Sequence, residues 1–211
     1  MLRKFGFWML HKIPNRLKFN LIFKFSLFGV SESKSGPGSS LENTESVRRE
    51  IVRLVSEREI SSIVDIPCGD FNWMSTISKS FSSYLGADIV EGVIANNRIR
   101  YPEFAFSVID AVNDEIPRAD LIICRDLLVH LNFKDGLRVI ENFRKSGSSF
   151  LLVTSFIKHS VNSELRGLWR PLNMELEPFF LTKPLAIIDE KCEEGGGLHR
   201  DKSLVLFKMS Q

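Results

Sequence analysis

The chain has 211 residues, of which 44% are hydrophobic and 26% are charged, and its formal net charge is +2. This length and composition are typical of one globular domain with a sizeable core, with room for a small appendage. They exclude collagen, low-complexity disorder and a small fold held together by disulfides.

The small net charge is an average over two unlike parts of the chain. Residues 1–31 contain six of the 28 Lys and Arg residues and no Asp or Glu. The remaining 22 basic residues face all 26 acidic ones, so residues 32–211 carry a net charge of −4. We therefore separate a basic, aromatic N-terminal segment, residues 1–30, from a mildly acidic domain, residues 31–211.

The N-terminal segment places large apolar rings between its basic residues. No stretch of it reaches the roughly 18–20 apolar residues of a transmembrane helix, because Lys18, Asn20 and Lys24 interrupt the pattern. Three interpretations stay open: a segment packed on the domain, a peripheral contact with an anionic membrane surface, and a cleaved targeting segment. The rings are Phe5, Phe7, Trp8, Phe19, Phe23, Phe25 and Phe28.

The three cysteines, Cys68, Cys124 and Cys192, are odd in number and widely spaced, and the four histidines lie far apart. A structural zinc site needs closely spaced ligands in pairs, so this pattern argues against one. A reducing, cytoplasmic setting fits unpaired cysteines best.

The first predicted elements are a loop and a helix. Residues 31–41 are rich in Ser, Gly and Pro, which predicts a plain linker or a loop that folds over another part of the protein. A helix is predicted to begin after Thr44 as its N-cap residue. Its apolar positions share one face: Val47, Ile51, Leu54 and Val55.

Strands and helices alternate in the next part of the chain. Continuous apolar strands separated by helices are typical of a parallel sheet covered on both faces. Strands are predicted over residues 60–67, 83–90, 104–109, 119–126 and 149–156. Helices are predicted over residues 71–81, 90–101 and 133–147, the last of them closed by Gly147.

The C-terminal part no longer follows this alternation of strands and helices. Residues 157–183 contain Trp169, Pro171 and Pro178 and predict a lid-like insertion. Residues 184–192 and 202–209 flank a Gly-rich turn and predict an antiparallel hairpin. We therefore expect an α/β fold with a mostly parallel sheet, a C-terminal antiparallel hairpin and helices on both faces.

Acidic side chains follow several of the predicted strands. The first strand ends in Asp65, followed by Cys68, Gly69 and Asp70. The second ends in Asp88, 19 positions beyond Gly69, and the third in Asp110; the fourth ends in Cys124-Arg125-Asp126. Ligands bind at the carboxyl ends of the strands in such sheets, so we expect the site there.

The residues at these ends favour one kind of ligand. An acid about 20 residues beyond the first turn is placed to bind a ribose diol. A dinucleotide also needs a glycine-rich turn for its pyrophosphate, whereas this turn has a single glycine and Asp70 repels phosphate. S-adenosylmethionine (SAM), a nucleoside with a cationic sulfonium and no phosphate, fits better.

The chain resembles the class I SAM-dependent methyltransferases, through Asp65-x-x-x-Gly69, Asp88 and Asp110 at consecutive strand ends. More narrowly, it resembles a bacterial and viral group whose relatives are linked to O-methylation of sugars in surface glycans. The motifs are DIPCGDFNWM, GADIV, DLIICRDLLVHL, WRPLN and DKSL, and the match runs from about residue 35 to 207. Pro67 departs from the class pattern, which has glycine there, and implies a stiffer first turn.

This resemblance implies a Rossmann-like fold with seven strands and a role for each matching residue. Asp65 and Gly69 would shape the pocket for the methionine end of SAM, with Asp70 near its ammonium group. Asp88 would hold the ribose hydroxyls and Asp110 the adenine amino group. Cys68, Trp73 and Cys124 complete the expected cofactor site, although a buried Trp73 is as often plain core.

The catalytic residues are expected just past the fourth strand. A sugar hydroxyl is a weak nucleophile, so removal of its proton during attack assists the transfer. Asp126 and His130 are four residues apart and would share a face of a helical turn. Either His130 is the base and Asp126 orients it, or Asp126 is the base and His130 binds the substrate; we favour the first. Arg125 would grip an acidic group of the acceptor or pair with a carboxylate of the pocket.

The insertion supplies the expected acceptor site. Trp169, Arg170 and Asn173 offer a stacking ring beside polar donors, which suits a sugar ring. The alternative is a lid that only packs on the body of the domain. No metal site is expected. Nucleic acid is disfavoured as a partner, because the domain is acidic. A methyltransferase for a small molecule, protein or RNA, and a non-catalytic SAM-binding protein, are the alternatives.

Overall fold

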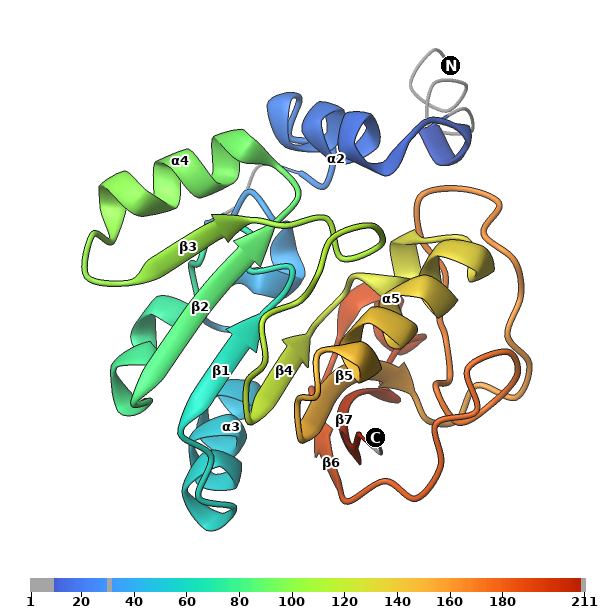
Figure 1. The fold of residues 1–211 in the computed structure, drawn as a ribbon. Coiled ribbons are helices and arrows are strands. Elements are labelled where there is room, and N and C mark those ends of the chain that lie inside the picture. The colour runs from blue at the N-terminus through green and yellow to red at the C-terminus, as the bar shows by residue number, and fades with distance from the viewer. Residues whose placement is uncertain (1–9, 30–31, 210–211) are drawn as a thin grey trace.

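The computed structural model describes residues 10–29 and 32–209. Its centre is a seven-stranded sheet in the order β3-β2-β1-β4-β5-β7-β6 (Figure 1). The strands are β1 (Ser62–Asp65), β2 (Ser83–Asp88), β3 (Ala105–Val108), β4 (Leu121–Cys124), β5 (Phe150–Phe156), β6 (Ala186–Asp189) and β7 (Lys202–Lys208). The α-helices are α2 (Asn15–Lys24), α3 (Glu45–Glu57), α4 (Glu91–Arg100) and α5 (Phe133–Lys145).

The pairing of the strands confirms the expected fold class. Strands β1 to β5 are parallel to one another, and β7 runs antiparallel between β5 and β6. The β6–β7 hairpin therefore closes the sheet with its second strand on the inside. Because β1, β2, β3 and β4 are parallel, their carboxyl ends lie along one edge of the sheet.

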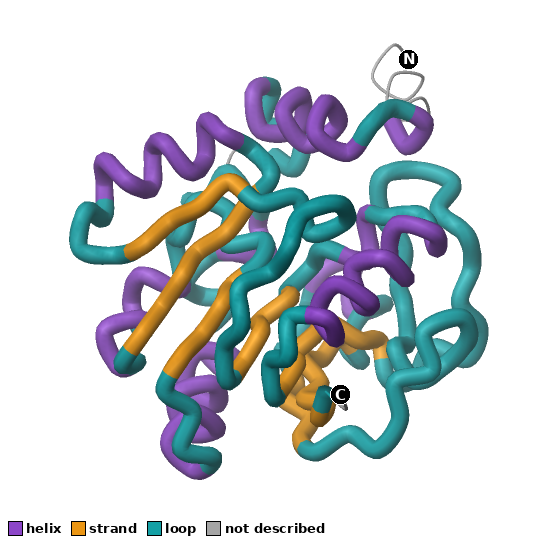
Figure 2. Tube along the Cα trace, viewed as in Figure 1, coloured by secondary structure: helices purple, strands orange, loops and turns teal. Residues whose placement is uncertain are grey.

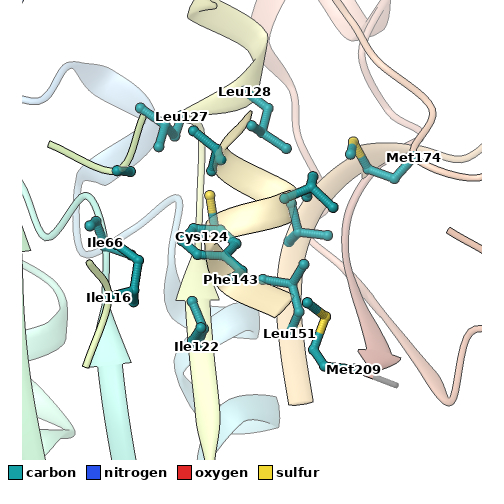
Figure 3. Close-up of a cluster of buried hydrophobic side chains, with 14 of the residues drawn as sticks. Ile66, Ile116, Ile122, Cys124, Leu127, Leu128, Phe143, Leu151, Met174 and Met209 are labelled. Carbon is teal, nitrogen blue, oxygen red and sulfur yellow. The ribbon is translucent and has the colours of Figure 1, made fainter. Parts of the chain in front are cut away.

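Two apolar layers cover the sheet. On one face, Phe143 of α5 packs against Ile122, Cys124 and Leu151 of the sheet, together with Met174 of the segment that follows β5 (Figure 3). On the other face, the predicted apolar stripe of α3 is buried together with Ile94 of α4. The stripe is Val47, Ile51, Leu54 and Val55.

The caps of two helices follow different chemistry. Asn132 precedes α5, and its side chain accepts a hydrogen bond of 2.8 Å from the backbone N–H of Asp135, which stabilises the helix start. Gly147 follows the end of α5 with a φ of +71°. This left-handed backbone conformation is typical of a glycine that ends a helix, as predicted. Thr44 is at the N-cap position of α3, but its hydroxyl donates to the carbonyl oxygen of Ser40 instead of capping.

The helix predicted over residues 71–81 is wrong. Two short 3-10 turns, Met74–Thr76 and Ser78–Ser80, stand there instead. The hydroxyls of Ser75, Thr76 and Ser78 donate to backbone carbonyls three or four residues earlier. Such bonds compete with the helical ladder, so the apolar pattern alone does not produce a helix.

The described part of the N-terminal segment is packed on the domain, as the first of the three interpretations expects. Helix α2 lies across the carboxyl ends of the strands (Figure 1). Its Asn15 donates to Asp135 at 2.9 Å, its Arg16 pairs with Glu91 at 2.9 Å, and its buried Lys18 donates to a backbone carbonyl. Residues 1–9, with the rings at positions 5, 7 and 8, lie outside the described residues.

The predicted insertion contains no helix or strand and runs as a long loop between β5 and β6 (Figure 2). Leu172, Met174, Phe179 and Leu181 anchor it in the apolar layer below α5. Within the described residues, no helix is long and apolar enough to span a membrane.

Candidate functional site

A cavity of about 280 Å³ lies at the carboxyl ends of the strands, beneath the N-terminal segment. Its floor comes from residues 67–70 after β1, residues 88–90 after β2 and residues 125–127 after β4. Phe19, Ile22, Phe23 and Phe28 of the N-terminal segment form the roof. Phe156, Trp169, Cys192, His199 and Lys202 line its other end.

The turn after β1 is held by the Ser-rich loop. Gly69 has a φ of +54°, and a Cβ atom there would collide with the hydroxyl of Ser35. The carboxylate of Asp70 accepts hydrogen bonds of 2.8 Å from the hydroxyl of Ser33 and from the backbone N–H of Lys34. The described part of this segment, residues 32–41, is therefore a loop that folds over the cavity, the second of the two interpretations.

Asp88 lies at the end of β2 and lines the cavity. Its carboxylate accepts hydrogen bonds from the backbone N–H of Val90 at 2.9 Å and of Gly69 at 3.2 Å. Burial raises the pKa of this carboxyl to about 6, although these backbone donors oppose the rise. Asp88 thereby joins the turn after β1 to the end of β2.

Four other residues of the expected cofactor site divide into two groups. Cys68 and Trp73 line the cavity. Asp65 and Cys124 lie beneath it, buried, and contribute no surface to it. The hydroxyl of Tyr84 donates to Asp65 at 2.7 Å, and burial raises the pKa of Asp65 to about 7. Asp65 therefore supports the floor from within, and Cys124 is part of the apolar layer.

Asp110 lies beside a smaller gap of about 20 Å³ next to the main cavity. Its carboxylate accepts hydrogen bonds from the backbone N–H of Val112 at 2.9 Å and from the side chain of Asn113 at 2.8 Å. Asp88 and Phe19 border both spaces. The two acids expected to hold a nucleoside are thus neighbours of one divided space.

Four charged side chains form a cluster at the base of the cavity. Arg125 and Lys202 are the cations, and Asp126 and Glu190 the anions; all but the partly exposed Asp126 are buried. Arg125 contacts Glu190 at 2.6 Å and also donates to the carbonyl of Gly38 at 2.9 Å, and Lys202 contacts Asp126 at 2.7 Å. We call these four residues the ion cluster.

Within the ion cluster, Asp126 and Lys202 keep each other charged. Burial opposes ionisation of Asp126, but Lys202 and Arg125 outweigh it and hold its pKa below the ordinary value. Burial likewise opposes the charge on Lys202, and Asp126 and Glu190 outweigh it and raise its pKa. Of the two roles expected for Arg125, the geometry shows pairing with a carboxylate of the site. Sequence reasoning missed both Glu190 and Lys202; the available signal for Lys202 was a lysine at the start of a strand whose residues 204–207 are apolar.

The expectation that Asp126 and His130 share a helical face is wrong. Asp126 has a φ of +59°, and only residues 128–130 form a 3-10 turn. The orienting partner of His130 is the carbonyl oxygen of Leu168, to which its Nδ1–H donates. Burial lowers the pKa of His130 to about 4, so the ring is neutral at pH 7 with a lone pair on Nε2.

Only one of the three expected acceptor residues lines the cavity. Trp169 does, and it is 37% exposed. Arg170 is buried and donates to the carbonyls of Leu131 at 2.6 Å and of Ser163, and Asn173 is buried and donates to the carbonyl of His159 at 3.1 Å. The expectation that Arg170 and Asn173 line the acceptor site is therefore wrong. Their side chains bind backbone carbonyls, because a segment without regular structure needs side chains to satisfy its backbone.

His199 lies in the cavity, with its ring 4.8 Å from that of Trp169 and 5.8 Å from that of Phe156. No companion of this histidine is evident from the sequence, since these two rings come from residues at least 30 positions away. Within the described ranges, no group of three or more His, Cys, Asp or Glu residues is placed to hold a metal ion.

The comparison with solved structures identifies the fold. N-methyltransferase NodS from Bradyrhizobium japonicum WM9 matches with a TM-score of 0.65 and 12% identity, over 91% of this chain and 98% of that chain. Magnesium protoporphyrin IX methyltransferase (ChlM) from Synechocystis PCC 6803 matches with a TM-score of 0.61 and 11% identity, over 92% and 98%. No protein-family model and no curated protein matches the chain. The chain has the fold of the class I SAM-dependent methyltransferases.

The buried Asp65 predicts an unusual dependence of stability on pH. Its pKa is raised from 3.8 to about 7 in the folded state, so the folded protein binds the extra proton and loses stability as pH rises between these values. Relative to Asp65→Asn, we expect the wild type to lose on the order of 4 kcal/mol between pH 4 and pH 7. Thermal unfolding across this range measures the difference.

Asp120 is the control with the opposite sign. Backbone N–H groups of Ser61 and Ser62 lower its pKa, so the wild type should gain stability over Asp120→Asn as pH rises. If the wild type and Asp65→Asn keep a constant difference across the range, the assigned state of Asp65 is wrong.

Proposed function

We propose that the protein is a SAM-dependent methyltransferase that transfers a methyl group to a hydroxyl group. The single observation that carries this proposal is the cavity at the carboxyl ends of the strands, with Asp88 on its floor beside the turn at Gly69. In open α/β sheets this is where nucleoside ligands bind. The fold of known methyltransferases supports the choice of ligand.

The residues present fit SAM better than a dinucleotide. Residues 67–70 form a turn with one glycine, and Asp70 gives it a negative charge. This disfavours a pyrophosphate and favours a ligand with a cationic group. Asp88 would bind the ribose hydroxyls, and the gap beside Asp110 would receive the adenine. The carboxylate of Asp70 accepts hydrogen bonds from Ser33 and Lys34 of the Ser-rich loop. It would therefore bind the methionine end of SAM directly only after this loop moves away, and otherwise would support it through the loop.

SAM supplies a methyl group on a sulfonium that is already a good electrophile. The work left to the protein is to align the acceptor, exclude water and take the proton from the attacking hydroxyl. His130 is the residue suited to take this proton, because it lines the cavity with Nε2 unprotonated. Asp126 is a weaker candidate for the base, because its carboxylate is paired with Lys202 and Arg125. These cations lower its pKa and make it a poorer proton acceptor.

The acceptor is best understood as a sugar hydroxyl of a glycan. Trp169 is partly exposed at the cavity, and an exposed aromatic face is suited to a sugar ring; His199 lies beside it with polar ring nitrogens. A second candidate is a small apolar or aromatic molecule with a hydroxyl group. It is favoured by the aromatic lining of Phe19, Phe23 and Phe28. Methyl transfer to purified sugars and to simple phenols separates the two.

Calorimetric titration tests the cofactor. We expect SAM and S-adenosylhomocysteine to bind with one site per chain and NAD to bind far more weakly. Asp88→Ala should weaken SAM binding about 10- to 100-fold, because hydrogen bonds to a charged group contribute about 1.5–3 kcal/mol. Glu141→Ala, which removes an exposed acid of α5 that pairs with Lys145 and does not line the cavity, is the control. Absent SAM binding, or tighter binding of NAD, contradicts the proposal.

His130→Ala tests the base. Loss of a general base lowers turnover by about 10²- to 10⁴-fold, and affinity for SAM should stay unchanged because another part of the cavity holds the nucleoside. Since burial lowers the pKa of His130 to about 4, kcat measured at saturating SAM and acceptor should be flat through neutral pH and lose the contribution of His130 only near pH 4. His159→Ala is the control. Equal turnover in His130→Ala and the wild type would remove His130 from the mechanism.

We also propose that the outer face of α2 contacts an anionic membrane surface. This face exposes Leu17 and Phe25 beside Lys24, and the described part of the segment has no acidic residue. Flotation with anionic vesicles should carry the full chain, and the double variant Leu17→Ser, Phe25→Ser should float less. Ile99→Ser removes an even more exposed apolar residue from α4 and serves as the control. Failure of the wild type to float on anionic vesicles contradicts the contact.

A further inference from the structure

The N-terminal segment touches His130 at both its ring and its backbone. The ring of Phe28 stacks on the imidazole, with centroids 4.9 Å apart and an interplanar angle of 29°. Phe19 approaches it edge-on, with centroids 6.3 Å apart. Lys18 donates a hydrogen bond of 2.8 Å from its Nζ to the carbonyl oxygen of His130.

The N-terminal segment does more than cover the cavity, because one of its charged side chains is buried against His130. Lys18 is only 2% exposed, and burial lowers its pKa to about 8. A buried ammonium group is costly unless it is paired, so its bond to the carbonyl of His130 is built into the packing. Its charge also lies 4.7 Å from the centre of the Phe19 ring, which stabilises it further.

The remaining side of the imidazole is fixed from the loop after β5. The carbonyl of Leu168 accepts from Nδ1–H and so fixes the tautomer. Arg170, two residues later, donates to the carbonyls of Val129 and Leu131, on either side of His130. Only the ring's face and its Nε2 edge then depend on the N-terminal segment.

We propose that Phe28 is a positioning residue for His130: its stacked ring holds the imidazole so that Nε2 faces the acceptor, and Lys18 fixes the backbone beneath it. This inference rests on the proposed function for the role of His130 in proton removal. Lys18, Phe19 and Phe28 of the segment are thereby part of the site. The same ring keeps water from the face of the imidazole.

Four charged groups surround His130. Asp126 precedes it in the same loop and favours the imidazolium ion, whereas Lys18 of α2 and Lys202 of β7 disfavour it. Arg170 adds a further cation on the side of the insertion. Removing Phe28 changes none of these charges and admits water, so the imidazolium is better solvated and the pKa of His130 rises toward its ordinary value.

The experiment compares Phe28→Ala, Phe28→Tyr and Phe180→Ala in the full chain. NMR titration of histidine-labelled protein follows the imidazole of His130, whose signal is assigned by its loss in His130→Gln. In Phe28→Ala we expect its titration to move up by at least one pH unit and the acid limb of kcat to move with it. Turnover should fall at least tenfold. Phe28→Tyr should keep the wild-type titration of His130 and the wild-type turnover, because it keeps the stacked ring.

Phe180→Ala removes a ring of the same size that is 61% exposed and does not line the cavity, so titration and turnover should stay as in the wild type. If Phe28→Ala does not fold, Phe28→Leu keeps the apolar volume without the flat ring, and turnover should still fall while Phe28→Tyr stays active. Unchanged titration and turnover in Phe28→Ala or Phe28→Leu overturn the proposal, as does an equal effect of Phe180→Ala. The NMR titration does not depend on methyl transfer, so the two proposals can fail separately. Absence of methyl transfer in the wild type as well as in the variants would overturn the proposed function. A titration of His130 that is the same in Phe28→Ala as in the wild type would overturn the role of Phe28.

Discussion

The ion cluster is the interaction on which the rest of the site depends. Its four charges come from the end of β4, the residue after β6 and the first residue of β7, and Arg125 also contacts the backbone of the loop at Gly38. Buried charges are tolerated only when paired, and breaking such a pair typically costs about 3–5 kcal/mol. The strand ends, the hairpin and the loop over the cavity must therefore assemble together. The balance of two cations and two anions leaves the base of the cavity nearly neutral.

A second constraint comes from the parallel strands. Their carboxyl ends share one edge, so the residues after β1, β2 and β4 meet there although they are far apart in sequence. The N-terminal segment closes this edge from above, with Phe19 between the main cavity and the gap beside Asp110. A nucleoside that spans Asp88 and Asp110 would therefore contact Phe19 of α2.

Much of the fold was predictable because it follows from local patterns. Apolar runs identified the strands, and the acids after them identified the edge that carries Asp88. The roles of Arg170 and Asn173 were not predictable, since a polar residue in an irregular segment serves its own backbone as readily as a ligand. The pairing of Asp126 with Lys202 joins residues 76 positions apart, and no spacing rule finds such a pair. The stacking of Phe28 on His130 likewise depends on tertiary packing alone.

We propose that SAM occupies the space between Asp88, Asp110 and His130, and a crystal structure with bound S-adenosylhomocysteine tests this placement. We expect ribose hydroxyls on the carboxylate of Asp88, adenine in an enlarged gap beside Asp110, and the sulfur on the side of the cavity that His130 faces. A nucleoside bound elsewhere, or one whose sulfur points away from His130, would overturn this placement.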